Sequence, residues 1–230
     1  MNRADDLIDT AEMYLRCVLE LEEEGVAPLR ARIAQRLGHS PPTVSQTVAR
    51  MERDGLLTVN DDRRIELTPE GRSAAIRVMR KHRLAECLLA DILGLDWQLI
   101  HDEACRWEHV MSEAVERRLL DILGHPTESP YGNPIPGLAE LGDDEGDDFL
   151  GGMIALTDLP EVTGSVVVHR IGEPIQSDAT LLARLNSAGF RPNITVSVSR
   201  VGSRFRIDTG HQRIELDYST AAHVFVTTTA

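Results

Sequence analysis

Apolar positions in the first third of the chain predict three helices followed by a β-hairpin. Apolar residues recur every three or four positions over residues 9–25, 28–37 and 42–55, and this spacing places them on one face of a helix. Two short β-branched runs follow at residues 57–59 and 64–67, separated by a turn that contains Asn-Asp-Asp. Two helices across a tight glycine-containing turn, followed by a hairpin, are typical of a winged helix-turn-helix.

The rest of the chain changes from a helical to a β pattern. A long helix is predicted from the capping sequence at residues 68–70 to residue 92, and two further helices are predicted within residues 96–123. Short β-branched runs then predict a small β-barrel, with one helical interruption at residues 178–188. The predicted strands cover residues 165–169, 194–198, 204–207, 214–216 and 223–226.

These elements give a mainly α chain with β-structure in three domains. We expect a winged helix-turn-helix over residues 1–76, a helical domain over residues 77–140 that is long enough for a dimer interface, and the β-barrel over residues 161–230. Residues 138–161 include eight acidic and no basic residues, so we interpret residues 141–160 as a solvated linker. The acidic run Glu22–Glu24 is interpreted as a solvated helix end.

Composition and charge narrow the function classes. The 230 residues are 42% hydrophobic, and no apolar stretch approaches the ~18 residues of a membrane helix. The start of the chain lacks the features of a signal peptide and the three cysteines are scattered, so we expect a cytoplasmic protein with reduced thiols and no membrane partner. The net charge of -13 speaks against a nucleic-acid partner, but residues 27–83 hold twelve basic and six acidic residues. Basic residues are therefore concentrated where the helix-turn-helix is predicted.

Two predicted helices carry potential metal ligands at helical spacing. The donors are His82 and Glu86 on the long helix, and His101, Cys105, Glu108 and His109 on the next. Side chains four residues apart share a helix face, so two facing helices could close around a divalent ion. Together with the Met13 thioether, this mixed set suits Fe(II), Co(II) or Ni(II) better than structural zinc. The alternative is that Cys105 is a buried apolar residue and that the histidines cap helices.

The second helix of the predicted helix-turn-helix presents side chains that could reach DNA bases. Gln46 can pair with adenine, while Ser40, Pro42 and Thr43 can pack against thymine methyl groups. Arginines later on the helix and at the hairpin tip are placed for phosphates. The candidate DNA-binding residues are Thr10, Arg30, Arg32, Ser40, Pro42, Thr43, Ser45, Gln46, Arg50, Arg53 and Arg63, with Arg64 beside the last. The alternative is a solvated helix face with incidental arginines.

Six long motifs in the first 140 residues or so point to one family. They are Asp9–Arg16, Leu29–Ala34, Thr43–Val48, Met51–Leu56, Met79–Glu86 and Glu103–Glu113. These motifs resemble the diphtheria toxin repressor family, in particular its iron-dependent regulators of the actinobacterial type. The C-terminal region is similar in layout but weaker in identity. The resemblance implies a helical metal-binding and dimerisation domain and an SH3-like β-barrel.

The resemblance also implies two metal sites in each subunit. The primary, activating site would contain Met13, Cys105, Glu108 and His109, with the Leu7 carbonyl acting through water. The ancillary site would contain His82, Glu86, His101, Glu173 and Gln176, and an anion would lie nearby at Arg83, Ser129 and Asn133. The expected cofactor is Fe(II), two ions per subunit, with Co(II), Ni(II), Mn(II) or Zn(II) substituting in vitro. Because Cys105 must lose a proton to ligate, metal affinity should weaken on acidification.

The expected partners follow from the same resemblance. The helical domain would form a homodimer with Trp107 in its interface, and two dimers would bind one palindromic double-stranded operator that controls iron uptake and storage genes. A metal that joins Met13 to the helical domain would fix the DNA-reading head relative to the twofold axis. The chain departs from the family at Pro41, where glycine is usual, so we expect Pro41 to be the helix boundary and Pro42 the first helical residue.

Three other functions remain open at this point. A metalloenzyme could use His82, Glu86 and His101, but it would need a general base in a cleft and none stands out. A winged-helix regulator could sense a small organic effector. A manganese-responsive regulator of the same superfamily would share most of the motifs.

Overall fold

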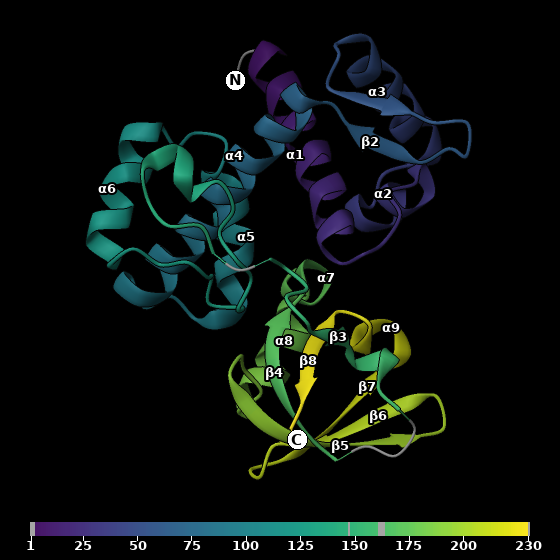
Figure 1. Ribbon diagram of the computed structural model, residues 1–230, viewed down its shortest axis with the longest axis vertical. Helices are drawn as coiled ribbons and strands as arrows, with labels where there is room; N and C mark the ends of the chain where they lie inside the picture. The colour runs from purple at the N-terminus through teal and green to yellow at the C-terminus, as the bar shows by residue number, and fades with distance from the viewer. Residues whose placement is uncertain (1–2, 147, 161–163, 230) are drawn as a thin grey trace.

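Two long helices run through the middle of the molecule and connect its parts (Figure 1). A computed structural model describes residues 3–146, 148–160 and 164–229, with side chains from Thr10 onward. Helices α1 (Arg3–Glu23) and α4 (Pro69–Cys87) pack together. In Figure 1 the N-terminal head lies beside α1, the other helices lie beside α4, and the C-terminal sheet lies below both. Among the described residues, no helix is long and apolar enough to cross a membrane.

The head has the predicted helix-turn-helix and wing. It contains α2 (Arg30–Leu37), α3 (Pro41–Arg53) and the antiparallel strands β1 (Leu57–Val59) and β2 (Ile65–Leu67). Ile33 of α2 and Val48 of α3 are fully buried against Tyr14 and Val18 of α1. The periodicity that predicted these helices is therefore the pattern of one apolar core.

Two predicted helix starts are wrong. Helix α1 begins at Arg3 instead of Asp9, and α3 begins at Pro41 instead of Pro42. Ser40 is the N-cap of α3, and its hydroxyl accepts a hydrogen bond from the Thr43 amide at 3.4 Å. The first amides of a helix have no intrahelical acceptor, so both prolines fit the first turn without loss of a hydrogen bond.

The helical domain follows the predicted order, with one irregularity. Helix α4 changes at Cys87 into a π-helical turn, η1 (Leu88–Ile92), and α5 (Trp97–Trp107) and α6 (Glu113–Leu123) follow. The buried guanidinium of Arg80 in α4 donates to Glu116 of α6 at 2.7 Å and to the Gly137 carbonyl at 2.7 Å. The ion pair joins α4 to α6, and the bond to Gly137 joins α4 to the segment that leads toward the C-terminal domain.

The acidic segment is packed and is not the solvated linker that we expected. It contains the 3-10 turns η2 (Leu138–Leu141) and η3 (Leu156–Asp158) and the short strand β3 (Ile154–Ala155). Phe149 is buried, and Arg170 of the sheet stacks over its ring at 5.3 Å and donates to the Asp148 carbonyl at 2.8 Å. These contacts come from a strand more than twenty residues away, which local composition could not reveal. Asp147 and Glu161 lie outside the described residues.

The C-terminal domain is a six-stranded antiparallel sheet with the strand order β3-β8-β4-β5-β6-β7. Its other strands are β4 (Ser165–Ile171), β5 (Ile194–Val201), β6 (Arg204–Asp208), β7 (Arg213–Asp217) and β8 (Val224–Thr228). Its helices are α7 (Glu173–Gln176), α8 (Ala179–Ser187) and α9 (Tyr218–Ala221). The segment that begins at Glu173, between β4 and α8, is thus a single helical turn.

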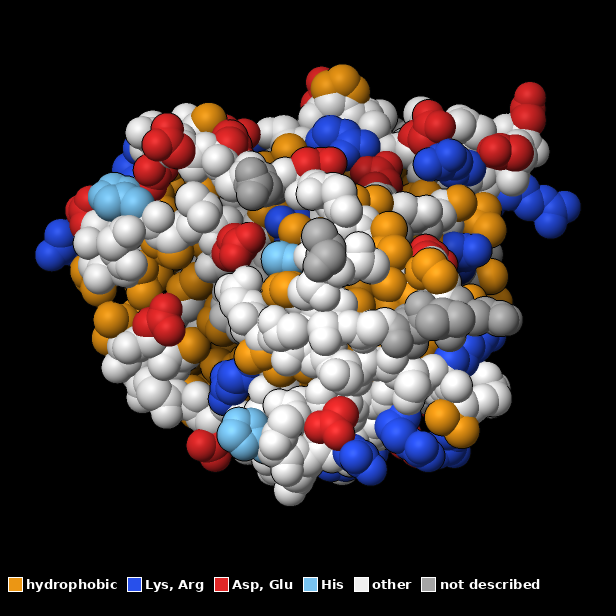
Figure 2. All heavy atoms as spheres, turned by 60° about the horizontal axis from the view of Figure 1, so that its bottom comes forward, with side chains coloured by type: hydrophobic (Ala, Val, Ile, Leu, Met, Phe, Trp, Pro, Cys, Tyr) orange, Lys and Arg blue, Asp and Glu red, His pale blue; other side chains and the backbone are white. Residues whose placement is uncertain are grey.

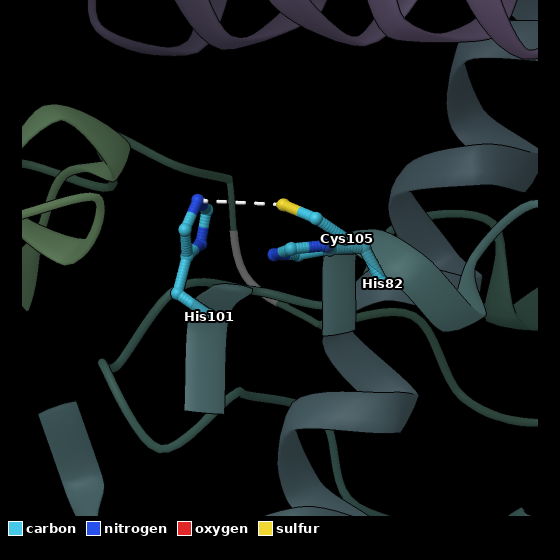
Figure 3. Close-up of side chains that lie close together, drawn as sticks. All are labelled: His82, His101 and Cys105. Atoms are coloured by element: carbon cyan, nitrogen blue, oxygen red, sulfur yellow. Dashed lines mark hydrogen bonds between the residues drawn. The ribbon is translucent and has the colours of Figure 1, made fainter. Parts of the chain in front are cut away.

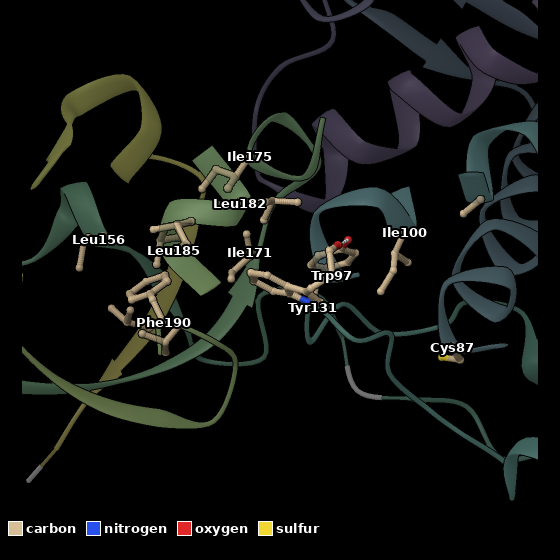
Figure 4. Packing of buried hydrophobic residues seen from close by; sticks show 14 of the residues in the cluster. Cys87, Trp97, Ile100, Tyr131, Leu156, Ile171, Ile175, Leu182, Leu185 and Phe190 are labelled. Atoms are coloured by element: carbon tan, nitrogen blue, oxygen red, sulfur yellow. Dashed lines mark hydrogen bonds between the residues drawn. The ribbon is translucent and has the colours of Figure 1, made fainter. Parts of the chain in front are cut away.

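One apolar core joins the helical domain to the C-terminal sheet. Trp97 of α5 and Tyr131 stack at 5.1 Å, and they belong to the same cluster as Leu182 and Phe190 (Figure 4). At Gly132 the backbone has φ +79°, and an added Cβ would lie 1.9 Å from the His169 carbonyl oxygen of β4. Only glycine permits this close approach. The shared core holds α7 against the helical domain.

Candidate metal centre and DNA-reading head

Side chains from α4, α5 and α7 converge on one buried point. His82 and Glu86 are one turn apart on α4, His101 lies on α5, and Glu173 begins α7; one ligand atom from each lies within 4.8 Å of all the others. His82 Nε2 is 2.9 Å from Glu86 Oε1, and His101 Nδ1 is 3.2 Å from Glu173 Oε2. The structure therefore brings together four of the five predicted ancillary ligands in one group.

Several buried polar atoms in this group make no hydrogen bond of good geometry, although His101 Nδ1 and Glu173 Oε2 form the ion-pair contact given above. They are Glu86 Oε2, His101 Nδ1, both carboxylate oxygens of Glu173, and Oε1 of the fifth predicted ligand, Gln176. The Gln176 amide nitrogen donates to the Ile171 carbonyl at 2.6 Å, and this bond leaves its oxygen free to accept. Because an unsatisfied buried polar atom is costly, several of them at one point fit a divalent cation with N and O ligands.

The predicted primary ligands at the C-terminal end of α5 lie beside this group. Cys105, His101 and His82 form a second cluster with metal-ligand spacing, and Cys105 Sγ is 3.6 Å from His101 Nε2 (Figure 3). His82 Nδ1 is 2.6 Å from Glu108 Oε2, while its Nε2 points to Glu86. His82 thus stands between the two predicted sites, which are neighbours in the folded chain.

Helix α1 meets these ligands through two residues that sequence reasoning missed. Arg16 contacts Glu108 and lies 2.8 Å from His82 Nδ1, and Glu12 Oε2 is 2.7 Å from His109 Nδ1. Met13, between them, is half-buried and packs against the core of the head. Leu7 is in α1 but outside the residues whose surroundings are described. The only indication in the sequence for a role of Arg16 and Glu12 was that they are charged residues close to the predicted ligand Met13.

Electrostatic interactions in the cluster favour the deprotonated, metal-binding forms of the carboxylates and the thiol. They favour the protonated form of the histidines, which cannot bind a metal. Burial raises the pKa of Cys105, yet the Arg16 charge and a His101 hydrogen bond outweigh it and lower that pKa to about 5. Burial likewise opposes protonation of His82, but the Glu86 charge leaves its pKa well above the ordinary value; His101 is raised in the same way, mainly by Cys105. In the metal-free protein, protons therefore occupy the imidazoles.

The predicted anion-site residues are all buried, and each has a partner within the protein. Arg83 pairs with Glu23 of α1 at 2.6 Å and 2.9 Å and is 3.7 Å from Glu173 Oε1. Asn133 donates to the Ile171 carbonyl at 3.1 Å, and the Ser129 hydroxyl accepts from the Tyr131 amide at 3.2 Å. Glu23 is thus an internal counterion for Arg83, and Glu24 pairs with Arg36 at 2.7 Å, so the interpretation of Glu22–Glu24 as a solvated helix end is wrong for both residues.

The DNA-reading candidates lie mainly on the exposed parts of the head. Pro42, Thr43, Ser45 and Gln46 are exposed on α3. The Ser40 hydroxyl is 2.8 Å from the Thr43 hydroxyl and caps the helix. Among the arginines, Arg32, Arg53 and Arg63 are exposed, whereas Arg30, Arg50 and the earlier candidate Thr10 are half-buried. Arg63 has φ 68° at the tip of the hairpin.

Comparisons with known proteins match all three parts of the chain. Residues 6–65 match the model "Iron dependent repressor, N-terminal DNA binding domain", and residues 68–137 match "Iron dependent repressor, metal binding and dimerisation domain". Residues 154–228 match the FeoA domain. The iron-dependent repressor IdeR of Mycobacterium tuberculosis is 54% identical over 228 residues, covering 96% of this chain and 98% of that protein. The diphtheria toxin repressor of Corynebacterium efficiens is 55% identical over 212 residues, covering 92% of each.

Solved structures show the same architecture. T. acidophilum IdeR is 26% identical with a TM-score of 0.75, covering 95% of this chain and 97% of that one. A manganese-dependent transcriptional repressor in complex with manganese is 26% identical with a TM-score of 0.76, covering 95% of this chain and all of the other.

A winged head attached to a buried group of metal donors, together with these relatives, defines a metal-dependent transcriptional repressor and not an enzyme. The chain belongs to the iron-dependent repressor family. Its DNA-binding and dimerisation domains indicate operator DNA and a second copy of the chain as partners.

Proposed function

We propose that this protein is an Fe(II)-dependent repressor that binds a palindromic operator and controls iron uptake and storage genes. The observation that carries the proposal is the contact of α1, which leads into the reading head, with Cys105, Glu108 and His109 through Arg16 and Glu12. The position of the head is thus coupled to the occupation of that ligand group. Cys105 supports Fe(II) over Mn(II), because a thiolate is a soft ligand.

We propose two ion positions per subunit, each formed by the chain's own residues. His82, Glu86, His101, Glu173 and Gln176 would hold the ancillary ion. Met13, Cys105, Glu108 and His109, with the Leu7 carbonyl through water, would hold the activating ion. A bound divalent ion supplies the positive charge that lets anionic donors from separate elements remain together. Glu173 and Gln176 make the ancillary site depend on the docked C-terminal domain.

The partners we propose are a second copy of the chain and, on each operator, a second dimer. Exposed apolar residues occur on α5, α6 and the turn between them, and they suit a helical dimer surface. They are Leu99, Val110, Val115 and Ile122. Trp107 is half-buried there, and its indole nitrogen donates to Glu103 at 2.9 Å.

In the complex with DNA, the exposed face of α3 would enter the major groove. Arg32, Arg53 and Arg63 would contact phosphates, and the half-buried Arg30, Arg50 and Thr10 would contribute from the edge of this surface.

Cys105→Ala tests the proposal. We expect the variant to remain a folded dimer in sedimentation but to lose Fe(II)-dependent retardation of a palindromic operator under anaerobic conditions, because the activating site loses its thiolate. Cys87→Ala is the matched control, since this buried thiol on α4 contacts the Glu128 carbonyl at 3.4 Å and belongs to neither proposed ligand set. Metal-responsive binding by Cys105→Ala would reject the site, and binding indifferent to a chelator would favour an organic effector.

A further inference from the structure

A fixed positive charge occupies the ligand group that we assign to the activating ion. Arg16 is buried, and its Nη1 lies 2.8 Å from His82 Nδ1 and contacts Glu108 Oε2. Both terminal nitrogens of the guanidinium lie 3.5 Å from Cys105 Sγ. One arginine therefore contacts two predicted primary ligands and one predicted ancillary ligand.

A guanidinium cannot act as a metal ligand, because it has no acceptor atom and stays protonated. It uses the same oxygen and sulfur lone pairs that an ion would need, and its charge repels a cation at short range. The contacts that Arg16 makes with Glu108 and Cys105 are therefore incompatible with an ion held by those two residues.

We infer that Arg16 is an internal competitor of the activating metal ion, which binds at Cys105 and Glu108 only when the guanidinium leaves them. This inference rests on the proposed function, because it concerns the same site. It makes Arg16 a positioning residue that raises the metal concentration at which the repressor becomes active.

The structure offers the displaced guanidinium another partner. Arg16 Nε is 3.0 Å from Glu20 Oε1, one turn later on α1, and the second oxygen of Glu20 is 3.6 Å from Arg36. Arg16 can therefore turn toward Glu20 without leaving a buried charge unpaired, which would be costly. Met13 is three residues before Arg16, on the same side of α1, so departure of the guanidinium opens the side from which Met13 is predicted to bind.

The exchange also links metal binding to the position of the head. Arg16 connects α1 to α5 in the metal-free arrangement, through Glu108 and Cys105. Replacing that connection by one through Met13 moves the contact by one turn of α1, to the turn that already meets His109 through Glu12. A shift of this kind between two discrete packings is a known form of switching between helices.

The test is an anaerobic Co(II) titration of the full chain, read from the near-ultraviolet absorption of the bond between Co(II) and the Cys105 thiolate. We expect Arg16→Gln to bind Co(II) about tenfold more tightly than the natural protein, because a repelling charge is removed. Arg16→Lys keeps the charge and should restore near-natural affinity. Arg36→Gln, the matched control, removes an equal charge from the next position in the same network and should change affinity less than about twofold.

Unchanged or weaker Co(II) binding by Arg16→Gln would overturn the inference, because Arg16 would then support the ligands of the loaded site. If this variant does not fold, as judged by circular dichroism, the double variant Arg16→Gln/Glu20→Gln removes the Glu20 charge together with its Arg16 partner. We expect the same tighter Co(II) binding from the double variant. An operator gel shift separates the two proposals. Metal-dependent binding by the natural protein without tighter Co(II) binding by the variant rejects only the role of Arg16.

Discussion

At the scale of single residues, His82 has the central position. Its two ring nitrogens face different predicted sites, Nε2 toward Glu86 at 2.9 Å and Nδ1 toward Glu108 at 2.6 Å. Neighbouring carboxylates keep the imidazole protonated in the metal-free protein despite its complete burial. A proton on His82 therefore neutralises part of the negative charge of the neighbouring carboxylates, as a bound metal ion would. The proton and the metal ion compete for the imidazole ring.

This competition predicts that metal affinity rises with pH across neutrality. The raised pKa values of His82 and His101 mean that both rings must lose protons on binding, whereas Cys105, with a pKa of about 5, is already a thiolate above about pH 6. Acidification should thus weaken binding because of the histidines, and not because of Cys105 as the sequence suggested. Calorimetry of Co(II) binding in buffers of different ionisation enthalpy should show release of about one to two protons near pH 7.

A remote histidine provides the control for that measurement. His125 pairs with Asp143 at 2.6 Å on the surface of the helical domain, and His125→Gln should leave the proton release unchanged. Affinity that is constant between pH 6 and pH 8 would contradict the prediction.

At the scale of elements, the start of α3 shows how a local sequence sets the reading helix. Ser40 has extended backbone angles, its hydroxyl caps the Thr43 amide, and two prolines occupy the first turn. Both prolines have restricted φ, so the unfolded chain loses less entropy when this helix forms. Pro41, at the position where the family usually has glycine, therefore makes the first turn of this helix conformationally restricted.

Replacing Ser40 by alanine should lower the free energy of unfolding by about 1 kcal/mol, because the Thr43 amide loses its side-chain acceptor. Urea unfolding followed by circular dichroism measures this difference. Ser203→Ala, in the exposed turn between β5 and β6, should have no measurable effect. An equal loss in both variants would show that the cap contributes nothing.

Periodicity predicted the longer helices and most strands, because each has an apolar face against a core, but it did not predict the single-turn helices α7 and α9 or the two-residue strand β3. It could not predict contacts between residues far apart in sequence. Glu23 pairs with Arg83, and Arg16 contacts Glu108. Because of such pairs, part of the acidic run that we expected to be solvated lies inside the protein, and so does Arg16. The α4 and α5 donors were found from their spacing, whereas Glu173 and Gln176 entered only through the family resemblance.

At the scale of the whole molecule, Glu24 connects the reading head to the C-terminal domain. Its Oε2 accepts from Arg36 of α2 at 2.7 Å and lies 3.1 Å from His223 Nδ1, next to β8. In Figure 1 the end of α1 lies above α7 and the strands of the C-terminal domain. The face of that domain turned forward in Figure 2 carries interspersed acidic and basic side chains. The contacts of Glu24 with Arg36 and His223 thus join the end of α1 to both the head and the C-terminal domain, in addition to the apolar core.

We expect Glu24→Ala to loosen this docking, because both Arg36 and His223 lose their carboxylate. Hydrogen exchange followed by mass spectrometry should show faster exchange in α7 and in residues 218–224. Glu22→Ala is the matched control, since Glu22 pairs with the exposed Arg72 of α4 at 2.8 Å. Unchanged exchange in Glu24→Ala would mean that the apolar core alone holds the domain in place.

The strand order places β3 and β7 at the two ends of the C-terminal sheet. Strand β3 has only two residues, and β7 alternates buried Ile214 and Leu216 with the exposed charges of Arg213, Glu215 and Asp217. A short or charged edge is a poor template for another chain's backbone. The sheet is therefore protected from edge-to-edge aggregation, and self-association is left to the helices, where it can be limited to a pair.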